Sequence, residues 1–248
     1  MRKNEDYDIL CYVRCIIIAE IGNFKDLNNL DHFFFDGYSL PESKLADVGR
    51  VHFFVNNINK YIFDNKGKVV LIPYFNGKIK EDGGVSAVLL GENFHFTCHT
   101  FCYKNTMFID YFGDKSKHGA VQDLILDTFP TTDYDLCKDN QDIKGNFGKH
   151  IIIRPASMVS FDEAKNLVSR ILTDIDMTPI NDVITSQTSD EQFDILQPIA
   201  ESHISFHRNG GQMVVDAFSC KYFDEAKLLS LLDNPKDYTE INRGIRYK

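Results

Sequence analysis

Two segments near the carboxyl end of the chain alternate apolar and polar residues, and they constrain its fold more than any other stretch. Residues 199–207 read Ile-Ala-Glu-Ser-His-Ile-Ser-Phe-His, and residues 213–220 read Met-Val-Val-Asp-Ala-Phe-Ser-Cys. A period of two is typical of β-strands that turn one face to a core. The intervening Arg-Asn-Gly-Gly suits a tight hairpin loop, because Asn and Gly tolerate positive φ angles. The pattern therefore predicts a β-hairpin that brings Ser202, His207 and Cys220 into one neighbourhood.

The length and charge of the chain limit what it can bind. Its 248 residues suffice for one large domain or for two of about a hundred residues each. A net charge of −9 argues against nucleic acid or an anionic membrane as a main partner, because no basic stripe could hold phosphates. The first residues are too charged for a signal peptide, and no stretch reaches the roughly 20 apolar residues of a spanning helix. We therefore expect a cytoplasmic protein with no nucleic-acid or membrane partner.

The cysteines and histidines of the first half raise the question of a metal site. Six cysteines in a cytosolic chain are expected to be reduced rather than paired. Four potential ligands fall close together in the sequence, namely His95, Cys98, His99 and Cys102. A strand here places His95 and His99 on one face and Cys98 on the other, so the four residues cannot converge on one ion. We therefore expect plain strand residues and no metal site.

The first half of the chain reads as a series of strands closed by a helix. Apolar runs predict strands over residues 12–20, 68–74, 85–90, 94–100 and 106–112. Between the first two of these the pattern is weak, apart from a helix expected between about residues 43 and 61. A helix over residues 118–129 ends before Pro130, which cannot continue it.

The second half follows the same order. A strand is predicted over residues 149–154. Ser160 and Glu163 form a capping box that starts a helix, whose apolar stripe extends to Ile175. A short strand at residues 182–185, the hairpin between residues 196 and 220 and a helix over residues 223–232 complete the chain.

The two halves match in spacing as well as in order. Ser202 follows Phe94 by 108 residues, and Asp216 follows Asp110 by 106, because the second hairpin turn is two residues shorter. Further matched pairs are His99 with His207, Phe112 with Phe218 and Asp114 with Cys220. We expect a duplication, with residues 1–140 as a degenerate repeat and residues 141–248 as the repeat that carries a site. A chance match between two hairpins is the alternative.

The residues of the predicted hairpin resemble the S-adenosylmethionine decarboxylase family, the pyruvoyl-dependent enzymes of polyamine (spermidine) synthesis. Bacterial members carry a Glu-Ser-His-x-[Ser/Thr]-x-His strand followed by a Val-Asp-x-Phe-Thr-Cys strand, which residues 201–207 and 215–220 match closely. The resemblance is clear over residues 196–232 and weak elsewhere. It implies an α/β fold, an αββα sandwich of two antiparallel sheets with outer helices. Each tandem repeat would supply one sheet, giving an internal pseudo-dimer that could also form a homo-oligomer.

The resemblance also implies roles for particular residues. The chain would cleave itself between Glu201 and Ser202, leaving pieces of 201 and 47 residues, and Ser202 would become a pyruvoyl cofactor. This group would form a Schiff base with the amine of the substrate, S-adenosylmethionine, before decarboxylation. His207 is implied to be the base of the elimination step, and Cys220 the acid that protonates the product.

Three positions depart from the family pattern or stay open. The family uses a serine eight residues before the pyruvoyl serine; the first copy has Ser86 in a Gly-Val-Ser segment, but the second copy has Asp194. Glu20 matches an Ala-Glu pair that the family uses around its substrate, whereas the second copy reads Arg154-Pro155. Asp216 is expected to be a hydrogen-bonded strand carboxylate rather than a catalytic group.

Two other functions are compatible with the same residues. The chain could be a catalytically inactive homologue that binds and activates a partner decarboxylase, which the aspartate at position 194 motivates. It could instead be a pyruvoyl decarboxylase for another amino acid, such as arginine or ornithine. A decarboxylase acting on S-adenosylmethionine is the leading hypothesis.

Overall fold

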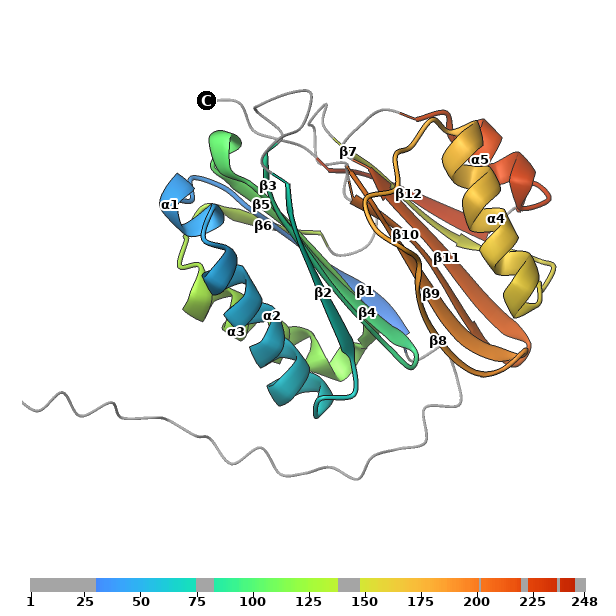
Figure 1. The fold of residues 1–248 in the computed structure, drawn as a ribbon, viewed down its shortest axis with the longest axis horizontal. Helices are drawn as coiled ribbons and strands as arrows, with labels where there is room; N and C mark the ends of the chain where they lie inside the picture. The colour runs from blue at the N-terminus through green and yellow to red at the C-terminus, as the bar shows by residue number, and fades with distance from the viewer. Residues whose placement is uncertain are drawn as a thin grey trace, which may run out of the picture.

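The first sheet is built by the first half of the chain. The computed structural model describes residues 30–74, 83–137, 148–200, 202–219, 223–235 and 237–243. The strands of the first sheet are β1 (Leu30–Gly37), β2 (Lys68–Tyr74), β3 (Gly84–Gly91), β4 (Phe94–Phe101), β5 (Thr106–Asp114) and β6 (Tyr134–Cys137). They are antiparallel in the order β2-β3-β4-β5-β1-β6. The outer face is covered by α1 (Glu42–Leu45), α2 (Val48–Phe63) and α3 (His118–Thr128), as Figure 1 shows.

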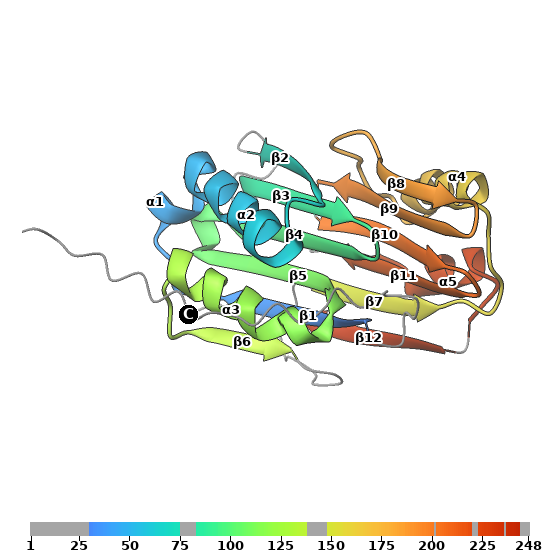
Figure 2. The same cartoon turned by 90° about the horizontal axis from the view of Figure 1, so that it is seen from below.

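The second sheet is built by the second half. Its strands are β7 (Gly148–Arg154), β8 (Ile184–Ser189), β9 (Gln192–Ile199), β10 (Ser202–Asn209), β11 (Gln212–Ser219) and β12 (Asp237–Arg243). Read from β8, their order is β8-β9-β10-β11-β7-β12, which repeats the order of the first sheet position by position. The helices α4 (Phe161–Asp174) and α5 (Glu225–Leu231) lie on its outer face (Figures 1 and 2). The predicted sandwich of two antiparallel sheets with outer helices is confirmed, while the duplication itself stays a prediction.

The clearest local signals of the sequence appear in the structure. Ser160 caps α4 through the expected capping box, in which its Oγ accepts from the backbone N–H of Glu163 and the Glu163 carboxylate accepts from the backbone N–H of Ser160. The hairpin loop between β10 and β11 contains Gly210 at a φ of 58°, a conformation that glycine adopts without strain. These two devices fix the start of one helix and the register of the central hairpin.

The first described strand of the first half is β1, which the sequence did not predict. In register, His32 of β1 lies opposite Phe112 of β5, as His150 of β7 lies opposite Phe218 of β11. The strand that corresponds to β7 is therefore β1, and residues 12–20, which we expected in that role, lie outside the described residues. The run of aromatic residues in β1 has both faces buried, so it lacks the alternation of a half-exposed strand.

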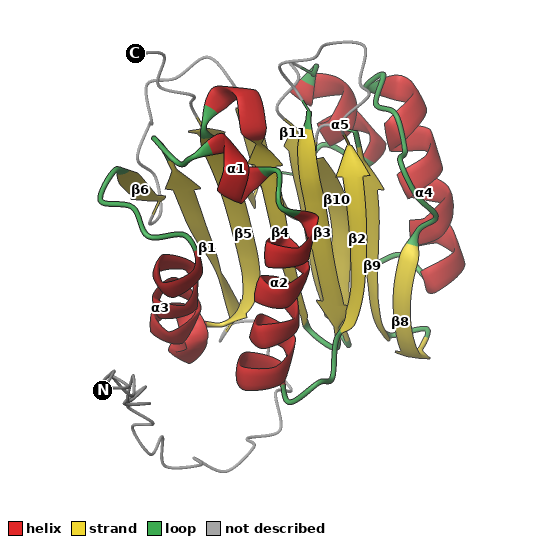
Figure 3. Ribbon diagram, turned by 60° about the vertical axis from the view of Figure 1, so that its left-hand side comes forward, coloured by secondary structure: helices red, strands yellow, loops and turns green. Residues whose placement is uncertain are grey.

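Three layers of buried side chains hold the sandwich together. One lies between the first sheet and its helices, and another between the second sheet and its helices. The third layer fills the space between the two sheets, which face each other in Figure 3. Its apolar part consists of three clusters: Leu30, Phe34, Phe112, Ile152, Val214 and Ile241; Val88, Leu90, Ile184 and Leu196; and Phe101, Phe108 and Phe218. Among the described residues, no helix is both long and apolar enough to cross a membrane.

Candidate active site between the two sheets

A band of buried polar side chains lies between the sheets, among the apolar clusters. Its members point away from the helices, because alternate residues of a strand point to opposite faces. They are His32, His95, His99, Asp110, His150, Asp194, His203, His207 and Asp216. Unpaired charge in such a closed layer is costly, so each group needs a polar partner.

Two aspartates and two histidines meet at the centre of the band. The Nε2 atom of His95 lies 3.1 Å from Asp110 Oδ2 and 3.3 Å from Asp216 Oδ2. The Nε2 atom of His203 lies 3.2 Å and 3.1 Å from the same two oxygens. We call these four residues the central cluster. Each sheet contributes one histidine and one aspartate, so the cluster is complete only when the two halves pack together.

Two further histidines contact the other oxygens of the same carboxylates. His32 Nδ1 lies 3.3 Å from Asp110 Oδ1, and His150 Nε2 contacts Asp216 Oδ1. Because His32 and His150 occupy matched positions in β1 and β7, these contacts repeat across the two halves.

The central cluster shifts the pKa values of its members. Burial alone would lower the pKa of His95, but hydrogen bonds to Asp110 and Asp216 raise it to about 9. Burial would raise the pKa of both aspartates, yet the surrounding histidines, above all His150, hold it well below the usual range. The cluster therefore favours the charged forms of both carboxylates and of His95.

A cross-strand polar pair lies on each flank of the central cluster. On one flank Ser86 Oγ lies 3.0 Å from His99 Nδ1, and on the other Asp194 Oδ1 lies 2.7 Å from His207 Nδ1. Ser86 faces His99 in the register of β3 and β4, as Asp194 faces His207 in that of β9 and β10. We call the two regions the serine flank and the aspartate flank.

The aspartate flank forms a continuous hydrogen-bonded chain. His207 Nε2 lies 2.7 Å from His95 Nδ1, which links the flank to the central cluster. The backbone N–H of Asn93 donates to both carboxylate oxygens of Asp194, at 3.1 Å each. Burial raises the pKa of Asp194 well above its ordinary value and lowers the pKa of His207 well below its own. Burial therefore favours the uncharged form of both groups.

The serine flank is arranged differently and lies beside the start of β10. The rings of His99 and His203 are stacked, with centroids 5.9 Å apart and an interplanar angle of 8°. Ser202 directly precedes His203; it is fully buried, and its Oγ has no hydrogen-bond partner among the described residues. At the matched position beside the aspartate flank, Phe94 stacks on Phe63 with centroids 3.8 Å apart. A buried hydroxyl with no described partner therefore occurs next to one flank, and an aromatic ring next to the other.

The sequence analysis expected His207 to lie close to Ser202, but the structure does not bring the two side chains together. The strand β10 pairs with both neighbours in regular register, so Ser202 and His207 point to opposite faces of the sheet. Five residues separate them, which is about 16 Å along an extended strand. Residues 199–207 are also not one strand, because β9 ends at Ile199 and β10 begins at Ser202. Glu20, Glu201 and Cys220 lie outside the described residues, and their roles stay predictions.

Sequence reasoning did not select the residues that pack against His203, the neighbour of Ser202. His99 and Ser86 belong to the first half, and we treated that half as a scaffold without a site. Their signal was present, since the Gly-Val-Ser segment and the spacing of 108 residues both mark them as matches of the second copy. The sequence did not show how the two halves pack, and this packing places the Ser86–His99 pair of the first half against His203 of the second.

Comparison with known proteins finds similarity among solved structures. No family model and no curated protein matches the chain. Among solved structures, the adenosylmethionine decarboxylase from Aquifex aeolicus VF5 is similar, with 21% sequence identity and a TM-score of 0.35. The match covers 42% of this chain and 96% of that one.

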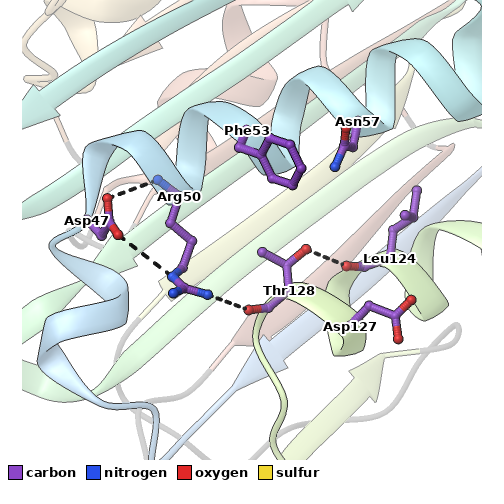
Figure 4. A pocket seen from close by; sticks show the side chains of 7 residues that line it. All are labelled: Asp47, Arg50, Phe53, Asn57, Leu124, Asp127 and Thr128. Atoms are coloured by element: carbon purple, nitrogen blue, oxygen red, sulfur yellow. Dashed lines mark hydrogen bonds and ion pairs between the residues drawn. The ribbon is translucent and has the colours of Figure 1, made fainter. Parts of the chain in front are cut away.

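A surface hollow between α2 and α3 lies apart from the polar band. Figure 4 shows the Arg50 side chain between Asp47 and the backbone carbonyl of Thr128, to which its guanidinium donates at 3.4 Å. Both helices lie on the outer face of the first sheet (Figure 1), so the sheet separates this hollow from Ser202. Arg50 links the two helices, and we assign the hollow no part in the site.

Proposed function

We propose that the chain is a self-processing, pyruvoyl-dependent decarboxylase whose single site is shared by its two halves. Ser202 of the second half supplies the nucleophile, and His99 and Ser86 of the first half supply and orient the base. The observation that carries the proposal is the stacking of His99, held by Ser86, against the residue next to Ser202. The resemblance of residues 201–207 and 215–220 to the decarboxylase family supports the same conclusion.

The first step is an acyl shift at the peptide bond between residues 201 and 202. The Ser202 hydroxyl oxygen attacks the carbonyl carbon of residue 201, the C–N bond breaks, and an ester with a free amino group results. A buried hydroxyl without a described partner suits this step, because no existing hydrogen bond has to be broken first.

The second step is an elimination that needs a base. Removal of the Cα hydrogen of Ser202 expels the carboxylate of residue 201 and leaves a carbon–carbon double bond. In an extended residue the Cα hydrogen does not share the direction of the side chain, so a base on the other face of the sheet can reach it. His99 lies on that face, and the hydrogen bond of its Nδ1 to Ser86 fixes the orientation of the ring.

Hydrolysis of the resulting enamine releases ammonia and leaves a pyruvoyl group at position 202. Its carbonyl supplies the electron sink that amino-acid decarboxylation requires. The buried start of β10 fits such a small group, since the serine from which it forms is fully enclosed there. We retain S-adenosylmethionine as the substrate, Cys220 as the acid and Glu20 as a substrate contact, all from the resemblance, with the reaction in the cytoplasm.

The aspartate at position 194, where the family has a serine that it uses in self-cleavage, does not lie at the serine flank. Asp194 replaces the family serine of the second half, but its partners are His207 and Asn93 on the aspartate flank. The serine flank has its own serine, Ser86. The substitution at position 194 therefore gives no support to an inactive homologue, and we do not favour that function.

Denaturing electrophoresis and mass spectrometry of the purified chain test the proposal. We expect pieces of 201 and 47 residues, the smaller one beginning with a pyruvoyl group, and no cleavage in the Ser202→Ala variant. Ser205→Ala is the matched control, because Ser205 is buried in the same strand and its Oγ also has no partner among the described residues. An intact, unmodified chain that still releases CO2 from the substrate would refute the proposal. Assays with S-adenosylmethionine, arginine and ornithine then identify the substrate.

A further inference from the structure

We propose that the central cluster binds one divalent transition-metal ion, most simply Zn²⁺, through His95, Asp110, His203 and Asp216. One Nε2 atom and one Oδ2 atom from each sheet would coordinate the ion and connect the two halves of the molecule. The proposal is independent of self-cleavage, since none of Ser202, Ser86 or His99 is a ligand.

The four nitrogen–oxygen distances in the cluster are short enough for one ion to contact all four atoms. These four N···O separations are 3.1, 3.3, 3.2 and 3.1 Å, and all four ligand atoms lie within 4.8 Å of one another. A tetrahedral zinc ion with bonds of about 2.0–2.1 Å holds its ligand atoms about 3.3–3.4 Å apart. Imidazole nitrogen and carboxylate oxygen are among the donors that zinc accepts, and a closed set of four is typical of a structural site.

Hydrogen bonds account for two of the four contacts, those of His95 with Asp110 and of His203 with Asp216. Each Nε2 atom lies almost equally close to the second carboxylate, but one N–H group can point well at only one oxygen. One ion at the centre would account for all four contacts. Bound by two imidazoles and two carboxylates, a divalent ion would also balance the charges of both aspartates.

The groups around the cluster resemble the outer shell of a metal site. Ligating histidines commonly bond through their second nitrogen, and ligating carboxylates through their second oxygen. His95 does so through His207, which in turn contacts Asp194. The Oδ1 atoms of the two aspartates are contacted by His32 and His150. These contacts fix the orientation of three of the four ligands.

Metal content of the untagged chain tests the inference. Elemental analysis after dialysis against zinc chloride is expected to give about one tightly held zinc ion per chain. Asp110→Asn and Asp216→Asn should lose this ion, whereas Asp36→Asn, which changes a buried aspartate of β1 outside the cluster and its proposed outer shell, should keep it. His32→Ala should weaken binding by about 10- to 100-fold, as expected for an outer contact. His52→Ala, which changes an exposed histidine, should leave the stoichiometry unchanged and identifies adventitious surface binding.

A second measurement applies to the unmutated chain, in case the aspartate variants do not fold. Cobalt(II) bound in place of zinc should give the intense visible absorption of a tetrahedral complex, and a strong chelator should lower the melting temperature reversibly. A wild-type chain that binds neither zinc nor cobalt under these conditions would overturn the inference. So would aspartate variants that fold and keep the full stoichiometry, and the cluster would then be a network of protonated histidines and carboxylates.

Discussion

The serine flank and the aspartate flank occupy matched places in two sheets with the same strand order, yet their chemistry differs. At the serine flank a Ser86–His99 pair lies beside a buried hydroxyl with no described hydrogen-bond partner. At the aspartate flank the corresponding pair is bonded onward to His95, and the residue in place of the hydroxyl is an aromatic ring. One flank contains the pair that we propose for proton transfer, and the other is occupied by packing and hydrogen bonds.

The difference teaches how a site can be divided between two similar halves. Each flank draws on both sheets. His99 of the first half stacks on His203, the residue after Ser202 in the second half, and His207 of the second half contacts His95, the residue after Phe94 in the first. A change at position 194 or 94 therefore alters the aspartate flank alone. Position 194 is an aspartate where the matched position 86 is a serine, and position 94 is a phenylalanine where the matched position 202 is a serine. Both of these residues belong to the aspartate flank.

Removing the base pair of the serine flank should have the largest effect on processing. We expect His99→Asn and Ser86→Ala to slow self-cleavage by about 10²- to 10⁴-fold, the range that general acid–base groups contribute. His207→Asn and Asp194→Asn, the matched changes at the other flank, should alter the rate by less than about tenfold. The intact fraction is measured by denaturing electrophoresis over time after synthesis.

Folding must be checked in these variants, because all four residues are buried. Circular dichroism and urea denaturation identify any variant that is unfolded, and such a variant is left out of the comparison. If folded His207→Asn and His99→Asn slowed cleavage equally, the two flanks would not differ as we describe. The base would then have to be sought on β10 itself.

Stability, in contrast to processing, should depend more on the aspartate flank, because aromatic packing supports that flank. Phe94→Ala removes a ring that stacks on Phe63 and should lower the free energy of unfolding by about 3–5 kcal/mol. We suggest measuring this by urea denaturation in the Ser202→Ala background, so that both chains stay uncleaved. Phe53→Ala, which truncates a phenylalanine that is 66% exposed, should change stability by less than about 0.5 kcal/mol. A loss below 1 kcal/mol for Phe94→Ala would contradict a packed aspartate flank.

The fold could be predicted from the sequence where local patterns are strong. The capping box at Ser160 and the alternation around His203 gave a helix start and a hairpin that the structure confirms. The strand β1 was missed because both of its faces are buried, and His32, which enters the polar band, is surrounded there by phenylalanines. The edge strands β6 and β12 were also missed. Their pairing partners lie far away in the sequence, so no local period marks them.

The candidate site could be predicted only in part, for a different reason. Residue identity and spacing pointed to Ser202. The matched spacing also made Ser86 the counterpart of Asp194, and His99 the counterpart of His207. Sequence reasoning nevertheless assigned the base to His207, on the strand of Ser202. The choice between His99 and His207 depends on how the two sheets pack, which a strand pattern does not contain. The central cluster was hidden for the same reason, since each half supplies only two of its four residues.

The matched ion pairs at the rim of the two sheets extend the comparison to the surface. In the first half Asp31 precedes His32 and accepts from Lys115 at 2.9 Å. At the corresponding place in the second half Lys149 precedes His150 and donates to Glu225 at 2.7 Å. The signs of the charges are reversed. The Lys149 side chain is 14% exposed, whereas that of Lys115 is 70% exposed, so solvent screens the second-half pair less.

Neutralising the acidic partner of each pair should therefore give a small but unequal loss of stability. We expect Glu225→Gln to lower the free energy of unfolding by about 0.5–1 kcal/mol at pH 7, and Asp31→Asn by less than about 0.5 kcal/mol. The hydrogen bond from Lys149 holds the pKa of Glu225 below its ordinary value. The ion pair therefore contributes fully to stability at pH values above the pKa that Glu225 has in the unfolded chain. This contribution is lost as the pH falls through the lower pKa that Glu225 has in the folded chain. Urea denaturation at pH 7 and near pH 3 measures this, and an equal penalty at both values would show that the loss comes from packing or from the first turn of α5 rather than from the charge.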